Sequence, residues 1–133
     1  MTTQEIQSLF RAHSFRATPQ RIAVYKYLCD HHTHPDVDEI YQVMIKENPN
    51  FSATTVYNAL KALEKEGLII AVTIDKDRIH YDVNIDTHGH IKCDKCGKIF
   101  DFIINDIKHS GIDDFDIRQK DIYFCGLCPD CKK

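Results

Sequence analysis

No run of apolar residues in this sequence is long enough to cross a bilayer. The opening run, MTTQEIQSLF, contains an acidic residue and lacks the apolar core of a secretion signal, so we expect a cytoplasmic protein without a membrane partner. Basic residues are not in excess, because the net charge is -3. A polyanion is therefore not expected to bind over the whole surface, and any nucleic-acid contact requires a local basic face. Internal repeats and low-complexity segments are also lacking.

The length of 133 residues allows one ordinary domain or two small ones. Neither half is long enough to bury a large core without help from a metal ion or a second copy of the chain. The hydrophobic content of 43% nevertheless places the chain among globular proteins. Six cysteines in a cytoplasmic protein are more typical of bound metal than of disulfides, so metal-binding is the first chemistry to look for.

Apolar residues at helical spacing predict four helices in the first half of the chain, the first of them over residues 4–13. The other three begin at residues that can cap a helix N-terminus: Thr18, Asp36 and Ser52. Pro19 suits the first position of the second helix, and Gly67 ends the fourth. Cys29 falls on the apolar face of the second helix and is interpreted as a small buried hydrophobe.

The face of the fourth helix that points away from its apolar residues is polar and basic. Its residues are Thr54, Thr55, Tyr57, Asn58, Lys61 and Lys65. Such a stripe suits a recognition helix in the DNA major groove, with lysines for phosphates and an amide for a base edge. An ordinary solvated face is the alternative and, for this helix alone, the commoner one. Arg16 and Gln20, near the start of the second helix, are assigned to the same DNA interface.

Residues 68–83 alternate in polarity and predict a two-stranded hairpin that turns between Asp75 and Asp77. Helices followed by such a hairpin have the order of a winged helix-turn-helix, which favours DNA binding over a solvated helix face. We therefore expect a winged-helix domain over residues 1–83 and a hinge over residues 84–87, where the periodicity is lost.

The remaining residues, 88–133, are expected to form a small C-terminal α/β dimerisation domain, which makes the whole fold α+β. Strands are predicted over residues 90–93, 98–102 and 115–124, and a short helix over residues 105–110. A domain this small needs a cross-link and a second subunit to be stable. We expect bound zinc to be the cross-link and a second copy of the chain to be the second subunit.

Two Cys-x-x-Cys pairs predict a zinc site with four sulfur ligands, a closed type of site that contributes folding energy. The predicted ligands are Cys93, Cys96, Cys128 and Cys131. The run CGLCPDC contains two overlapping pairs, so Cys125 is either a spare thiol at the end of a strand or an alternate ligand.

A second set of candidate ligands combines histidine with aspartate and contains no thiol. Its members are His34, Asp82, His88, His90 and Asp101. His88 and His90 are two residues apart, so on a strand they point to the same side and can hold one ion. Imidazole with carboxylate suits Mn(II) or Fe(II) better than a dedicated zinc site, and five ligands leave one position open on an octahedral ion. His34, next to a proline, could instead be a loop residue without a metal.

Five short motifs follow one another along the chain: TPQR at 18–21, HPDVDEIY at 34–41, ATTVYNAL at 53–60, HIKCDKCGK at 90–98 and CPDC at 128–131. On these motifs the chain resembles the ferric uptake regulator family of dimeric, metal-dependent bacterial repressors. The resemblance implies a winged-helix domain that binds a palindromic DNA operator and a C-terminal domain that forms the homodimer. It also implies a structural four-cysteine zinc and a regulatory metal between the domains.

Within this family the residues resemble the peroxide-sensing branch, whose regulatory ion is held by three histidines and two aspartates. Iron-sensing relatives usually have Glu in place of Asp82, and many have Arg in place of Asn58. The resemblance implies that hydrogen peroxide reacts with bound Fe(II) and that His34 or His88 is oxidised, whereas Mn(II) gives an insensitive repressor. Cys125 departs from the pattern, because relatives often carry an aromatic residue there.

Three other functions fit part of the pattern. An iron-level repressor would use the same ligands without oxidation. A non-haem iron enzyme also combines histidine with carboxylate, but the sequence offers a recognition helix and a wing instead of a substrate pocket, so we expect a regulator and not an enzyme. A thiol switch at the zinc site would produce disulfides and release zinc under mild peroxide.

Overall fold

The computed structural model describes residues 1–83, 88–118 and 120–133, and the chain divides into two compact units, Met1–Ile85 and Asp86–Lys133. The hinge expected at residues 84–87 lies outside the described residues. Within the described ranges, no helix is both long enough and apolar enough to cross a bilayer.

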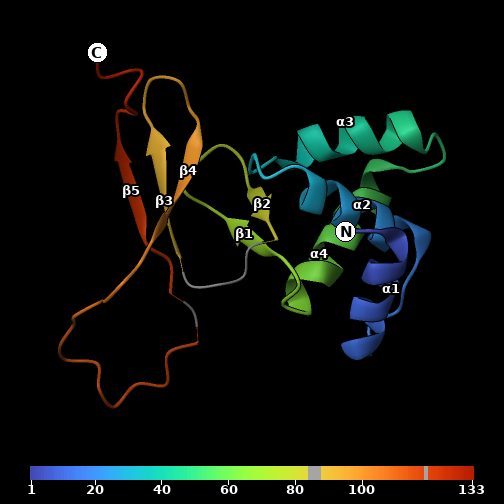
Figure 1. The fold of residues 1–133 in the computed structure, drawn as a ribbon, viewed down its shortest axis with the longest axis horizontal. Helices are drawn as coiled ribbons and strands as arrows, with labels where there is room; N and C mark the ends of the chain where they lie inside the picture. The colour runs from blue at the N-terminus through green and yellow to red at the C-terminus, as the bar shows by residue number, and fades with distance from the viewer. Residues whose placement is uncertain (84–87, 119) are drawn as a thin grey trace. The chain divides into compact units, whose positions relative to one another are not determined.

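Four helices form most of the first unit (Figure 1): α1 (Thr3–Ala12), α2 (Pro19–Asp30), α3 (Val37–Glu47) and α4 (Ala53–Lys65). Each begins at an N-cap residue whose side chain accepts a hydrogen bond from a backbone N–H of the first turn: Thr2, Thr18, Asp36 and Ser52. The last three caps were predicted and are confirmed. Gly67, with a φ of 78°, follows the C-cap of α4 in the left-handed conformation that ends helices.

The apolar faces of these helices meet in one core. The largest fully buried helix residues in this core are Ile6, Phe10, Val24, Leu28, Ile40, Met44, Val56, Leu60 and Leu63. Complete burial of such a side chain stabilises a fold by about 1.5–3 kcal/mol. Because the core uses one face of α4, the opposite face of that helix is left exposed to solvent.

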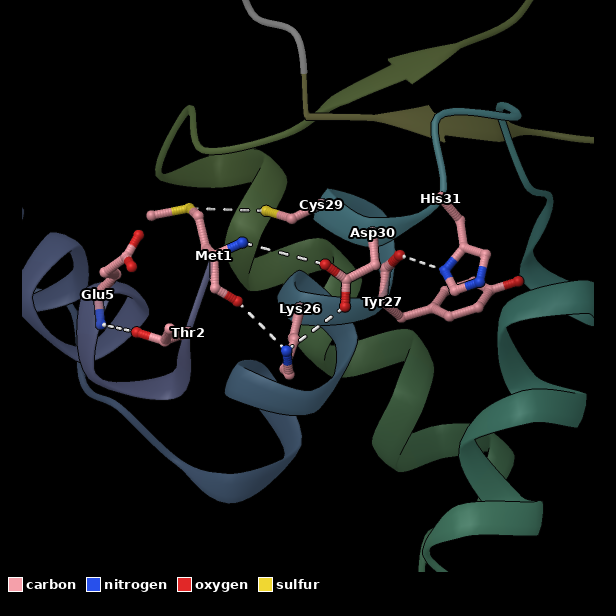
Figure 2. Close-up of polar contacts among 8 residues, drawn as sticks. All are labelled: Met1, Thr2, Glu5, Lys26, Tyr27, Cys29, Asp30 and His31. Atoms are coloured by element: carbon pink, nitrogen blue, oxygen red, sulfur yellow. Dashed lines mark hydrogen bonds and ion pairs between the residues drawn. The ribbon is translucent and has the colours of Figure 1, made fainter.

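The start of the chain lies against α2 (Figure 2). The Met1 carbonyl accepts a hydrogen bond from Lys26 Nζ at 3.2 Å, and the Met1 ammonium group lies 4.0 Å from Asp30. The Met1 thioether is 3.8 Å from the thiol of Cys29. Cys29 is partly buried against the core and burial raises the pKa of its thiol, in agreement with its interpretation as a small hydrophobe.

The first unit ends with the predicted hairpin. Its strands β1 (Ile70–Val72) and β2 (His80–Asp82) pair antiparallel, with Ala71 opposite Tyr81. The turn between them is closed by the Asp77 N–H, which donates to Asp75 Oδ1 at 3.0 Å. Tyr81 packs into the helical core, and burial raises the pKa of its phenol to about 12. This burial holds the hairpin, or wing, against the helices.

The second unit contains a three-stranded sheet in the order β4-β3-β5. Strand β3 (His88–Cys93) pairs antiparallel with β4 (Ile99–Ile103) and parallel with β5 (Tyr123–Gly126). The central strand β3 carries both histidines and the first cysteine of the predicted zinc site.

Two predictions for this unit were wrong. Residues 105–110 are described but are not helical, and the last strand begins at Tyr123 instead of Phe115. All side chains of 105–110 are exposed, and a helix this short is not stable without burial of one face. A strand starting at Phe115 would be longer than its partner β3, which has six residues. Its first residues would therefore have no residues of β3 opposite them with which to form backbone hydrogen bonds.

Candidate metal centres and nucleic-acid interface

The two Cys-x-x-Cys pairs lie at the same end of the strands in the second unit's sheet. Strand β3 ends at Cys93, and the turn that follows reaches β4 through Gly97, which has a φ of 77°. The second pair follows β5, where the Cys131 N–H donates to the Cys128 carbonyl at 3.0 Å. Because β3 and β5 are parallel neighbours, their C-terminal ends bring both pairs together.

The Sγ atoms of one cluster of thiols all lie within 4.8 Å of one another: Cys93, Cys96, Cys128 and Cys131. Cys96 Sγ and Cys128 Sγ are 3.9 Å apart. A zinc ion with Zn–S distances of about 2.3 Å places tetrahedral sulfurs about 3.8 Å apart, so this cluster fits the ion. Cys125 is exposed on β5, opposite Lys92, and lies outside the cluster.

Two of these thiols, Cys93 and Cys131, have pKa values shifted in opposite directions. The backbone N–H groups of Cys96 and Cys128 each donate to Cys93 Sγ at 3.4 Å and lower the pKa of that thiol to about 6. The Cys131 thiol has its pKa raised to about 12, mainly by its hydrogen bond with the Cys128 side chain. Zinc binds thiolates, so loading this cluster near neutral pH must release protons.

Two of the five predicted ligands of the regulatory metal belong to the first unit. His34 lies in the loop between α2 and α3, and Asp82 ends β2. Their side chains are buried, with Nε2 of His34 3.3 Å from Oδ2 of Asp82. The loop lies beside β2 because the Tyr81 N–H donates to the Pro35 carbonyl at 3.0 Å.

The other three predicted ligands of the regulatory metal converge in the second unit. His88 and His90 lie on the same side of β3, with their Nε2 atoms 3.0 Å apart. Asp101 of β4 is opposite His90, and its Oδ1 is 3.2 Å from His90 Nε2 and 3.4 Å from His88 Nε2. Metal–nitrogen distances of about 2.1 Å put two ligands at right angles about 3 Å apart, so these atoms fit an octahedral ion.

The candidate DNA face of α4 is exposed where the sequence predicted it. Thr54, Tyr57, Asn58 and Lys61 are exposed, whereas Thr55 is partly buried. Lys61 Nζ lies 5.1 Å from the Tyr57 ring centroid, within the range of a cation–π contact. The Thr55 N–H and hydroxyl both contact Ser52 Oγ, so Thr55 also takes part in the helix cap.

The start of α2 is next to this face. One pocket is lined by residues of both segments: Thr18, Gln20, Arg21, Thr55, Asn58 and Ala59. Arg16 is exposed and lies in the loop just before α2. The Arg16 carbonyl accepts a hydrogen bond from Arg21 Nη1 at 3.1 Å. The Arg21 guanidinium also lies 4.3 Å from the Phe15 ring centroid. Arg21 therefore orders the loop that carries Arg16, a role the sequence did not reveal.

Two residues of the wing were also missed. Arg78 Nη1 donates to Oδ2 of the buried Asp36 at 3.0 Å, across 42 positions of sequence. His80 Nδ1 donates to the His34 carbonyl, and its Nε2 lies 3.2 Å from Asp75 Oδ2. The only signal in the sequence is a group of charged residues around the wing turn, which does not identify their partners in the His34 loop.

The chain is similar to proteins of known family. Residues 12–121 match the model of the Ferric uptake regulator family. The peroxide-responsive repressor PerR of Staphylococcus aureus is 37% identical over 134 residues, which cover 97% of this chain and 90% of that protein. The solved structure of the Campylobacter jejuni peroxide stress regulator is 27% identical, with a TM-score of 0.68 and coverage of 98% of this chain and 99% of that one.

A zinc uptake regulator solved in complex with zinc and DNA has the same fold, with a TM-score of 0.71 and coverage of 99% of this chain and 96% of that one. At 22% identity this likeness concerns the fold alone. The family match covers most of the chain, and the relative from S. aureus matches it almost from end to end. This chain belongs to the ferric uptake regulator family and is a metal-dependent repressor of that family.

Proposed function

We propose that this protein is a homodimeric repressor that senses hydrogen peroxide through one regulatory iron ion. The proposed ligands of that ion are His34, Asp82, His88, His90 and Asp101. The observation that carries the proposal is the composition of two half-sites for the metal, His34 with Asp82 in the first unit and His88 and His90 with Asp101 in the second. In each half-site, imidazole and carboxylate atoms converge without a thiol. The 37% identity to a peroxide-responsive repressor supports the same conclusion.

Each group of ligands has a defined part in this proposal. His88, His90 and Asp101 are already within 3.4 Å of one another and form a preorganised half-site. His34 and Asp82 are proposed to complete the ligand set and so to link the winged-helix unit to the second unit. Closure of the site then holds the two recognition helices of the dimer at the spacing of a palindromic operator.

Held by these residues, Fe(II) would supply the redox chemistry by which hydrogen peroxide, a two-electron oxidant, transfers one oxygen atom to a ligand imidazole and leaves as water. The imidazole of His34 or His88 is then oxidised and loses its ability to donate to the metal. Loss of one ligand opens the site, so DNA affinity falls through geometry while the base-contacting side chains remain unchanged. Mn(II) accepts the same ligands without this chemistry and should give a peroxide-insensitive repressor.

DNA recognition is assigned to α4, the wing and the start of α2. The exposed Lys61 suits a phosphate, and Asn58 suits a base edge. Tyr57, Thr54 and Thr55 lie on the same helix, and Arg16 and Gln20 complete the proposed interface.

The second unit is proposed to carry the dimer contact. Phe100 and Phe124 are 40% and 55% exposed, and Phe124 stacks on Phe102 with ring centroids 4.8 Å apart. An exposed aromatic group on a sheet is the kind of surface that a partner covers. A second copy of the chain, with zinc at the four-cysteine cluster of each copy, is the proposed partner.

Peptide mass spectrometry tests the peroxide proposal. The Fe(II)-loaded and Mn(II)-loaded dimers are each treated with a slight excess of hydrogen peroxide, and binding to a palindromic duplex selected from random-sequence DNA is followed in parallel. We expect an added oxygen on His34 or His88 with iron only, together with loss of DNA binding. His109, an exposed histidine outside both half-sites, is the internal control and should stay unmodified.

The rival functions give different results in the same experiment. Unmodified histidines, with DNA binding that tracks free Fe(II), would identify an iron-level repressor. Disulfides among Cys93, Cys96, Cys128 and Cys131, with zinc release, would identify a thiol switch. Steady consumption of many equivalents of peroxide or a co-substrate without inactivation would identify an enzyme.

A further inference from the structure

Side chains attach the wing to the His34 loop through contacts that are not part of the backbone hydrogen bonding of any helix or strand. The imidazole of His80 lies between the two segments. Its Nδ1 donates to the His34 carbonyl, and its Nε2 lies 3.2 Å from Oδ2 of Asp75 in the wing turn. The other oxygen of Asp75 accepts the Asp77 N–H, so the same carboxylate also closes that turn. One imidazole therefore connects the wing turn to the backbone of a proposed metal ligand.

His34 adopts a backbone conformation that needs such support. Its φ is 55°, in the left-handed region that residues other than glycine rarely occupy. The next residue is Pro35, and a residue before proline strongly prefers an extended conformation. A residue in this position stays there only when its surroundings hold it. The hydrogen bond from His80 to its carbonyl acts directly on the peptide group that must be held.

The residues that follow His34 are held both by the first turn of α3 and by the wing. Oδ1 of Asp36 accepts the Glu39 N–H at 2.9 Å and caps α3, while Oδ2 accepts Arg78 Nη1 at 3.0 Å. The Pro35 carbonyl accepts the Tyr81 N–H at 3.0 Å. These contacts fix Pro35 and Asp36, and the hydrogen bond from His80 Nδ1 holds the carbonyl of His34 itself. His80 is thus placed to set the direction of the His34 side chain.

We propose that His80 is a positioning residue for the metal ligand His34, holding its left-handed backbone through the Nδ1–H hydrogen bond and linking it to the wing through Asp75. This inference rests on the proposed function, in which His34 binds the regulatory metal. The ligand and the wing then move as one piece, so that capture of the metal by His34 also fixes the wing. A contact that orients a metal ligand typically contributes 10–100-fold to metal affinity.

Two amide substitutions separate the two contacts of His80. His80→Asn keeps an N–H donor near the position of Nδ1 and loses the contact with Asp75. His80→Gln keeps a donor near the position of Nε2 and loses the contact with the His34 carbonyl. Mn(II) is titrated into the zinc-loaded full-length protein, and free Mn(II) is measured by electron paramagnetic resonance. We expect His80→Gln to weaken Mn(II) binding at least about tenfold and His80→Asn to stay within about threefold of the unsubstituted protein.

Thermal unfolding of both variants without Mn(II) provides the second readout. Similar midpoints, together with unequal Mn(II) affinities, separate positioning of His34 from general support of the fold. Wild-type affinity in His80→Gln, or equal losses in both variants, would overturn the role of His80. His34→Ala distinguishes the two levels of the proposal: if it binds Mn(II) as tightly as the unsubstituted protein, His34 is not a ligand and the proposed function itself fails.

Discussion

Gly89 lies between the two histidines of β3 and directly opposite Phe102 of β4. A Cβ atom at position 89 would lie 2.0 Å from Cζ of the Phe102 ring, so the ring occupies the space that a side chain would need. The same ring stacks on Phe124 of β5, with an interplanar angle of 15°. A single hydrogen in place of a side chain therefore lets one aromatic pair cover all three strands.

At the residue scale, Gly89→Ala should destabilise the second unit by about 1–3 kcal/mol, because the Phe102 ring must move to admit the methyl group. Urea unfolding of the zinc-loaded protein measures this change. Gly126→Ala is the matched control on β5, where a Cβ meets no atom within 4 Å, and it should change stability by less than about 1 kcal/mol. Equal losses in the two variants would show that the Phe102 contact is not the cause.

At the scale of one element, α4 has a buried face and an opposite, exposed face to which DNA binding is proposed. Its inner residues Val56, Leu60 and Leu63 are fully buried, whereas Tyr57 and Lys61 are exposed and contact each other. Changes on the outer face should therefore alter DNA binding without altering the fold. The cation–π contact also restricts the Lys61 side chain, which would lower the entropy lost in the proposed phosphate contact.

Lys61→Gln should weaken binding to the selected palindromic duplex uniformly across DNA sequences, because a phosphate contact carries no sequence information. The slope of log affinity against log salt should fall by about 1 for each copy of the chain that loses the contact. Fluorescence anisotropy at several salt concentrations measures both quantities. Lys46→Gln, an exposed lysine at the end of α3, should leave the slope unchanged. A change in sequence preference without a change in slope would contradict the phosphate assignment.

At the scale of the whole molecule, the two units depend on different sources of stability. The first has a core of fully buried side chains contributed by all four helices. In the second, the buried residues among those described are Gly89, His90, Cys93 and Cys128, and the last three are candidate metal ligands. The second unit therefore depends on its metal far more than the first does.

Removal of zinc by a chelator should unfold the second unit while the first keeps its helices. Because every described helix lies in the first unit, helical circular dichroism should change little. Tyr123 is the only one of the six tyrosines in the second unit, so loss of the sheet should change tyrosine fluorescence through that residue alone. Cys128→Ser should lose zinc, whereas Cys125→Ser should keep it. Equal zinc contents in the two variants would argue against the four-cysteine cluster.

Zinc affinity should also depend on pH in a defined direction. Cys131, whose thiol pKa is raised to about 12, is protonated at neutral pH without metal, whereas Cys93, with a pKa of about 6, is largely ionised there. Binding must displace the proton of Cys131 throughout this range, and below about pH 6 that of Cys93 as well. Affinity should therefore fall as the pH falls, and fall more steeply in acid, which competition with a chelating dye over a pH series measures.

The sequence by itself determined the features that depend on near neighbours. Caps at Thr18, Asp36 and Ser52 and the wing hairpin all follow from residues within a few positions of one another, which is why local patterns predict them. The pairing of His88 with His90 on one side of a strand has the same origin, because alternation is a property of the strand itself.

Tertiary structure decided the features that depend on register and burial. The parallel pairing of β3 with β5 selects Cys128 and Cys131, and not Cys125, for the thiol cluster. Exposure of every side chain over 105–110 removed the helix expected there. The hydrogen bond from His80 to the His34 carbonyl joins residues 46 positions apart, and local sequence patterns carry no information about such a contact because it exists only once the wing has packed against the helices.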